Sequence, residues 1–135
     1  MAAGYSSNPL SKKLGYKEGF VVRLINPPTN YNELTDHVLD QVVQVDDPVT
    51  CADLIHFFTN SLHEFETQLP VLKQQVKKNG CIWISWYKKS AKKPTELTEN
   101  LIRELALASG LVDVKVCAVD EEWSGLMLVY RLADR

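Results

Sequence analysis

The sequence predicts one α/β domain in which helices cover both faces of a mostly parallel β-sheet and the C-terminal strand runs antiparallel. Short apolar segments of strand length alternate with segments of helical periodicity, which is typical of β-α-β units. The last two strand-like segments follow each other across a short turn, as they do in a hairpin. With right-handed crossovers, this order gives a Rossmann-like three-layer sandwich.

The chain has 135 residues, which is enough for one hydrophobic core and too few for two domains. We therefore expect a single domain over residues 1–135, with an N-terminal helix segment in residues 1–18 and the sheet with its covering helices in residues 19–135. Its 45% hydrophobic and 24% charged residues are typical of a soluble globular protein, and its net charge of -2 argues against a surface built mainly for nucleic acid. No apolar stretch has the length of a membrane span and the first residues lack a secretory signal, so we expect a cytoplasmic protein without a membrane partner.

Apolar and β-branched residues predict six strands. They lie at residues 20–25, 42–45, 53–58, 81–86, 112–118 and 126–132. The first is a nearly unbroken apolar run, which suggests a strand buried on both faces. It stops at Asn26, Pro27 and Pro28, because proline removes an amide donor from the strand.

Four helices are expected before and between these strands. They lie at residues 9–14, 30–40, 61–78 and 95–108. Residues 7–8 would cap the first helix, Ser61 and Glu64 have the spacing of a capping box, and Thr95 would cap the fourth helix. Pro70 is expected to kink the third helix or to split it in two, because proline removes an amide donor and crowds the preceding turn.

The three cysteines are widely spaced. Cys51, Cys81 and Cys117 form no C-x-x-C pair and have no histidine at ligand spacing. We therefore interpret them as reduced thiols that pack as small apolar side chains, and we expect no metal.

Several short runs are spread over nearly the whole chain. They are Ala3-Gly4-Tyr5-Ser6, Pro9-Leu10, Lys12-Lys13-Leu14-Gly15, Trp86 with Lys88-Lys89, Leu97-Thr98-Glu99, Arg103-Glu104-Leu105-Ala106, Gly110-Leu111-Val112-Asp113, Lys115-Val116-Cys117-Ala118-Val119-Asp120 and Trp123-Ser124-Gly125-Leu126. Together they resemble a family of small bacterial proteins known only as a domain of unknown function. That resemblance implies a bacterial source and a single-domain protein, and it implies no catalytic residues.

A second resemblance is architectural and begins at Asp53. The segment Lys77-Lys78-Asn79-Gly80 before a strand, together with the closing hairpin, is similar to the back half of class I S-adenosylmethionine-dependent methyltransferases. This resemblance implies S-adenosylmethionine as a possible cofactor, with Asp46 or Asp47 where an acidic residue would meet ribose hydroxyls. The front half departs from that family, because residues 26–28 replace the glycine-rich turn that lets the backbone approach the cofactor. One helix and one strand of the usual enzyme also have no counterpart in the sequence.

Open parallel sheets bind ligands beyond the carboxyl ends of their strands. The candidate ligand-binding residues at these ends, which we call the strand-end rim, are Asn26, Asp46, Asp47, Thr59, Asn60, Trp86, Lys88, Lys89, Asp120, Trp123 and Ser124. Tryptophan rings would supply stacking surface and the lysines positive charge, so the strand-end rim would suit a flat or anionic ligand.

The same residues also allow a purely structural interpretation. Trp123 would hold the C-terminal hairpin against the strand that carries Trp86, and Lys88 or Lys89 would pair with Asp120. As a surface pair, it would contribute roughly 0 to 1 kcal/mol.

The sequence contains no nucleophile, metal or phosphate-loop motif, and it identifies no catalytic residue. The leading hypothesis is a non-catalytic Rossmann-like binding or interaction module, with a small molecule or a protein as its partner at the strand-end rim. The alternative is a degenerate S-adenosylmethionine-dependent methyltransferase-like enzyme. A nucleic-acid binder is the weakest hypothesis and depends on four lysines within residues 88–93.

Overall fold

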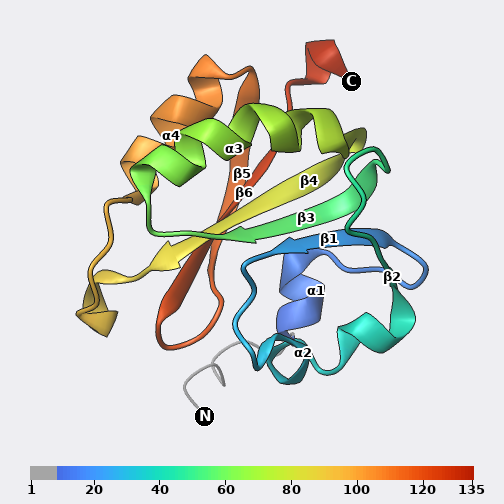
Figure 1. Ribbon diagram of the computed structural model, residues 1–135, viewed down its shortest axis with the longest axis horizontal. Helices are drawn as coiled ribbons and strands as arrows, with labels where there is room; N and C mark the ends of the chain where they lie inside the picture. Colours follow the sequence, from blue (N-terminus) through green and yellow to red (C-terminus); the bar gives the residue numbers. More distant parts are fainter. Residues whose placement is uncertain (1–8) are drawn as a thin grey trace.

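The computed structural model describes residues 9–135, and Figure 1 shows a six-stranded sheet with helices on both faces. The strands are β1 (Val21–Ile25), β2 (Val43–Gln44), β3 (Ala52–Phe58), β4 (Val76–Tyr87), β5 (Leu111–Ala118) and β6 (Trp123–Tyr130). The α-helices are α1 (Leu10–Leu14), α2 (Tyr31–Leu34), α3 (Leu62–Gln75) and α4 (Glu99–Ala108). Short 3-10 helices are η2 (Val38–Gln41), η3 (Lys89–Ala91) and η4 (Leu132–Asp134).

The strand order across the sheet is β2-β1-β3-β4-β6-β5. β1 pairs in parallel with β2 and β3, and β3 pairs in parallel with β4. β6 lies between β4 and β5 and is antiparallel to both, so β5 runs in the same direction as the first four strands. The predicted fold class, a mostly parallel sheet between helical layers with an antiparallel C-terminal strand, is confirmed.

α3 and α4 lie over one face of the sheet (Figure 1), and a core of mostly aliphatic side chains with a few aromatic rings lies beneath them. Phe65, Leu69 and Leu72 of α3 contribute to this core, and each is at most 2% exposed. Beneath them, Ile82 and Ile84 of β4 are fully buried. We call this side of the molecule the aliphatic face.

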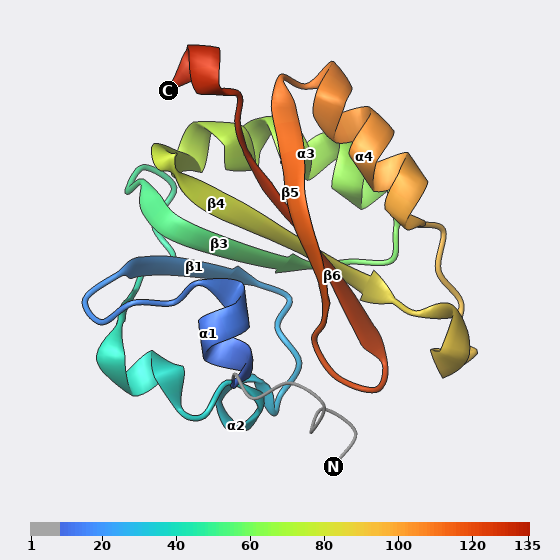
Figure 2. The same ribbon diagram turned by 180° about the vertical axis from the view of Figure 1, so that it is seen from behind.

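α1 and α2 lie over the opposite face of the sheet (Figure 2). A chain of buried polar groups lies on this face. The Tyr16 hydroxyl lies 2.7 Å from the Tyr31 hydroxyl, which lies 2.9 Å from Nδ1 of His56. Nε2 of His56 lies 2.8 Å from Oγ of Ser85. These four residues, which we call the buried polar chain, are each at most 9% exposed. This side of the molecule is the polar face.

α1 is held on the polar face by a hydrogen bond from Trp83 of β4. The indole N–H of Trp83 donates to the carbonyl of Leu14, with a distance of 2.8 Å. Gly15 then ends the helix in the left-handed conformation, with φ of 89°. The cap expected at residues 7–8 lies outside the described residues.

α3 is one helix, so the expected split at Pro70 is wrong. Pro70 and Glu66, whose carbonyl would have accepted the missing amide, are both exposed, and water can replace the lost donor. The helix also ends earlier than residue 78, because Val76 already pairs with Ala52 of β3 as the first residue of β4.

The helix expected over residues 30–40 is two short pieces, α2 and η2. Asp36 and His37 separate them with φ of 56° and 59°, a left-handed conformation that interrupts a helix. The expected strand at residues 42–45 is reduced to the two residues of β2. The cap of α4 is Thr98 and not Thr95, since Oγ1 of Thr98 accepts from the amide of Leu101.

Candidate functional site

The carboxyl ends of β1, β3, β4 and β5 lie along one edge of the sheet, because these strands share one direction. The turn between β5 and β6 closes the same edge (Figure 1). The strand-end rim therefore forms around these four strands, as the sequence predicts. The end of β2 is different, because Val43 pairs with Val21 at the start of β1.

Asp46 and Asp47 therefore lie away from the tip of β1. The carbonyls of Asp47 and Thr50 accept from the guanidinium of Arg23, in the middle of β1, at 2.6 Å each. The carboxylate of Asp47 accepts from the amides of Val49 and Thr50 and from the Thr50 hydroxyl, which lowers its pKa. Asp47 thus builds a turn, whereas Asp46 is exposed.

A carboxylate that the sequence analysis assigned only to a helix cap, Glu64, joins the ends of β1 and β3. Its Oε1 accepts from the Thr59 hydroxyl at 2.5 Å, and its Oε2 accepts from the side-chain amide of Asn26 at 3.2 Å. The Asn26 amide also donates to the carbonyl of Phe58 at 3.1 Å. Only half of the predicted capping box is formed, since Oγ of Ser61 accepts from the Glu64 amide while the Glu64 side chain reaches the strand-end rim.

Asn60 connects the end of β3 to the end of β4. Its Oδ1 accepts from the Tyr87 amide at 2.8 Å, and its carbonyl accepts from the Glu96 amide at 2.9 Å. The Glu96 carboxylate in turn accepts from the Leu62 amide at the start of α3. Asn60 and Thr59 therefore use their polar atoms to hold neighbouring backbone segments together.

The two tryptophans of the strand-end rim lie on opposite faces of the sheet. Trp86 belongs to the aliphatic core and is only 6% exposed. Trp123 lies on the polar face, where its ring centroid is 4.5 Å from that of Tyr87 and 5.0 Å from that of Phe58. The partner of Trp123 is thus Tyr87, a residue that the sequence analysis did not single out although it directly follows Trp86.

The turn between β5 and β6 is built by Asp120. Its Oδ1 accepts from the amides of Glu122 and Trp123 at 2.8 Å each. The Lys88 amide donates to the carbonyl of Glu122 at 2.9 Å, which ties this turn to the end of β4. Asp120 therefore shapes the turn instead of pairing with a lysine.

The ion pair of this region joins Lys93 to Glu122 at 2.5 Å. This hydrogen bond raises the pKa of Lys93, whose ammonium also lies 5.3 Å from the Tyr87 ring centroid. Lys88 is half-buried, Lys89 is exposed, and neither side chain makes an ion pair within residues 9–135. Ser124 is half-buried and pairs with Trp86 in the sheet. We call Tyr87, Lys93, Asp120, Glu122 and Trp123 the hairpin clasp.

No family model and no curated protein matches the sequence. Solved structures do match it, over most of its length. A Sulfolobus solfataricus protein provisionally classed as a type 11 methyltransferase is 18% identical, with 93% of this chain and 92% of that chain covered and a TM-score of 0.64. A TehB-like S-adenosylmethionine-dependent methyltransferase from Corynebacterium glutamicum is 13% identical, with 96% and 91% covered and a TM-score of 0.55. The chain has a methyltransferase fold.

A third match is a Burkholderia thailandensis enzyme, 1,6-didemethyltoxoflavin-N1-methyltransferase, whose structure contains its substrate and S-adenosylhomocysteine. It is 15% identical, with 90% of this chain and 76% of that chain covered and a TM-score of 0.59. These likenesses establish the arrangement of strands and helices. They assign no activity to this chain, because one fold supports many functions.

S-adenosylmethionine is the cofactor that this fold implies, and the turn after β1 does not fit it. Asn26 has φ of 56° but carries a side chain, which is bonded to Glu64. Pro27 and Pro28 have no amide hydrogen to donate. The turn thus lacks both the open backbone of glycine and two consecutive donors, and the helix that follows has only four residues.

Two further properties concern residues 9–135. No helix in this part of the chain combines the length and the hydropathy of a membrane span. The same residues contain no group of three or more histidine, cysteine or acidic side chains arranged to hold a metal ion.

Proposed function

We propose that this protein is a non-catalytic ligand-binding or interaction module built on the methyltransferase fold. The observation that carries the proposal is the cluster at the ends of β1 and β3, where Asn26 and Thr59 both bind Glu64. Polar atoms that would face a cofactor are used there to connect the strands and α3. Pro27 and Pro28 support the same function, because they leave no amide donors in the turn.

The surface that remains available for a partner lies at the ends of β4 and β5. Lys88 and Lys89 directly follow Tyr87 in the chain, and the half-buried Tyr87 ring contacts that of Trp123. Cations next to aromatic edges favour an anionic or flat partner. This region of the strand-end rim is the binding surface of the proposed module.

A degenerate S-adenosylmethionine-dependent enzyme is the second candidate, and the fold comparison is the observation that favours it. The three matched structures are described as methyltransferases, and one contains S-adenosylhomocysteine. In this function, the exposed Asp46 would meet the ribose hydroxyls of the cofactor.

Calorimetric titration and thermal unfolding of the full chain with S-adenosylmethionine and S-adenosylhomocysteine separate the two functions. We expect no saturable binding and no stabilisation, whereas a ligand at a hundred times its Kd would stabilise the fold by about 2.7 kcal/mol. Saturable binding that is lost in Asp46→Ala and kept in Asp40→Ala, another exposed aspartate, would support the cofactor site of the second function. Reproducible turnover of the methyl donor would establish that function and overturn the first.

A second experiment tests the binding surface. Immobilised wild-type protein and the double variant Lys88→Glu/Lys89→Glu are compared for the ligands they retain from a cell extract. We expect the wild type to retain an anionic partner and the double variant to lose it, because the reversed charges repel that partner. Lys12→Glu is the matched control, since Lys12 is exposed on α1. Equal retention by wild type and double variant would contradict this surface.

A further inference from the structure

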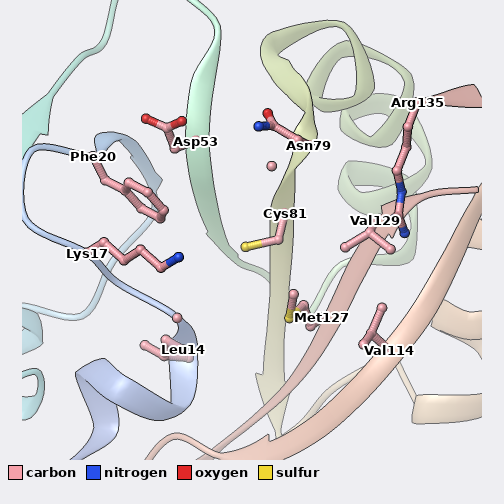
Figure 3. Close-up of a pocket in the computed structure, with 12 residues that line it drawn as sticks. Leu14, Lys17, Phe20, Asp53, Asn79, Cys81, Val114, Met127, Val129 and Arg135 are labelled. Carbon is pink, nitrogen blue, oxygen red and sulfur yellow. The ribbon is translucent and has the colours of Figure 1, made fainter. Parts of the chain in front are cut away.

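A pocket lies at the other end of the sheet from the strand-end rim, on the polar face. It has a volume of about 340 Å³, which is in the size range of small-molecule sites. Figure 3 shows the lining of this pocket, which comes from seven separate parts of the chain. They are the end of α1, the segment before β1, the first halves of β3, β4 and β5, the second half of β6 and the last residue described. We call it the amino-end pocket.

Most of the surface in the amino-end pocket is apolar. Leu14, Phe20, Val114, Met127 and Val129 form its walls. Gly15 also lines the pocket, and a Cβ built on it would meet nothing within 4 Å, which is consistent with open space at this point. A small apolar group of a ligand would therefore be buried away from water here.

Cys81 forms part of the wall as a neutral thiol. Its side chain and the side chain of Lys17 extend toward the same space (Figure 3). Burial raises the pKa of Cys81 to about 12, so the thiol stays protonated and behaves as an apolar surface. Covalent chemistry at Cys81 is not part of the site.

The charges around the amino-end pocket are predominantly positive. Lys17 and Arg135 line it, and Lys115 is close enough to act on the thiol of Cys81. Within residues 9–135, none of these three cations makes an ion pair. The lining carboxylate, Asp53, is already bound by the ammonium of Lys77 at 3.0 Å and by a backbone amide of β1.

We propose that the amino-end pocket binds a small amphipathic anion, a carboxylate carried on a short alkyl chain. Its chain would lie against Leu14, Phe20 and Met127, and its carboxylate would lie beside Lys17, which faces Arg135 from the opposite side of the pocket (Figure 3). This site is independent of the strand-end rim, so either proposal can fail without the other.

The chain offers an unusually clear reporter for this site, because it contains only two methionines, Met1 and Met127. Labelling the methionine methyl groups with carbon-13 gives two signals, and a Met127→Leu variant assigns the one from the pocket. We expect sodium octanoate to shift the Met127 signal saturably in the full chain. Octylammonium, which has the same alkyl chain and the opposite charge, should not.

Two pairs of matched variants test the position and the charge of the site. Val114→Trp should abolish the shift by filling the pocket, while Val116→Trp, a similarly exposed position of β5 outside the lining, should keep it. Lys17→Glu should weaken octanoate binding about tenfold or more, because a charge-assisted contact is replaced by repulsion. Lys12→Glu should bind like the wild type.

Any of three results would overturn the proposal. They are the absence of a saturable octanoate shift, an equal response to octylammonium, and octanoate binding that is unchanged in Lys17→Glu and Val114→Trp. Lys17 and Val114 are exposed, so both variants are expected to fold like the wild type. A thermal unfolding curve of each variant checks that a loss of binding is not a loss of the fold.

Discussion

The two faces of the sheet are packed by different means. The aliphatic face is covered by α3, with 14 residues, and α4, with 10 residues, and its core is a large cluster of apolar side chains. The polar face is covered by α1, with five residues, and α2, with four. There the buried polar chain fills the space beneath the short helices.

The difference shows that two kinds of core can stabilise one sheet. Aliphatic packing depends on volume, so any well-shaped apolar side chain of the right size is tolerated. The buried polar chain depends on partners, because each buried donor or acceptor that loses its partner keeps the full cost of leaving water. The two faces should therefore respond differently to substitution and to pH.

The largest effect is expected on the aliphatic face. Phe65→Ala should lower the free energy of unfolding by about 3 to 5 kcal/mol, because Phe65 is fully buried and its removal leaves a cavity. Urea denaturation measures this loss. Val71→Ala on the same helix is the control and should cost much less, since Val71 is 43% exposed. Similar losses in both variants would mean that α3 does not pack as described.

The polar face should make stability depend on pH through His56. Burial lowers the pKa of His56 from 6.5 to about 3, so between these values the unfolded chain binds a proton that the folded chain does not. The free energy of unfolding should therefore fall as the pH is lowered from about 6.5 toward 3, by up to about 1.4 kcal/mol per pH unit. Denaturation of wild type and His56→Gln at pH 7 and pH 4 checks this expectation.

The control for the pH experiment is His63→Gln, because His63 is exposed on α3. This variant should keep the pH dependence of the wild type, and His56→Gln should lose a large part of it. If the free energy of unfolding falls by the same amount in His56→Gln and in the wild type between the two pH values, the acid sensitivity comes from the carboxylates. The polar face then does not make stability depend on pH.

A smaller loss is expected when the buried polar chain is interrupted in its middle. Tyr31→Phe removes the hydroxyl that contacts both Tyr16 and His56, so two buried groups lose a partner. The expected cost is about 1 to 3 kcal/mol. Equilibrium denaturation at pH 7 measures it, and a cost near zero would show that neither buried neighbour depends on this hydroxyl.

The smallest effect is expected at the end of the buried polar chain. Tyr16→Phe removes a hydroxyl that is hydrogen-bonded to the Tyr31 hydroxyl, and Tyr31 keeps its hydrogen bond with His56. The expected cost is about 1 kcal/mol, below that of Tyr31→Phe. The double variant should cost less than the sum of the two, because both changes act on the same hydrogen bond. Strictly additive costs of the two substitutions would contradict the buried polar chain.

The sequence predicts the α/β fold class because strands and long helices are local patterns. The apolar run at 53–58 and the helical stripe after Ser61 correspond to β3 and α3 within a few residues. The short elements between β1 and β3 were less predictable. Asp36 and His37 adopt left-handed conformations there, and β2 is reduced to two exposed residues.

The location of the strand-end rim follows from topology, but the roles of its residues do not follow from sequence. Composition cannot tell that Asp120 shapes its own turn or that Glu64 reaches across to Asn26 and Thr59. Those contacts depend on side-chain distances across strands that are distant in the chain. The amino-end pocket was missed for the same reason, since its lining is assembled from seven parts of the chain.

The position of β6 has a consequence for how the protein is made. β6 is the last strand in chain order, yet it lies between β4 and β5. While the ribosome is still synthesising β6, β4 has no partner strand on one side and β5 has no partner strand at all. The nascent chain therefore exposes unpaired strand edges, which are prone to pair with other chains, until β6 emerges and completes the sheet.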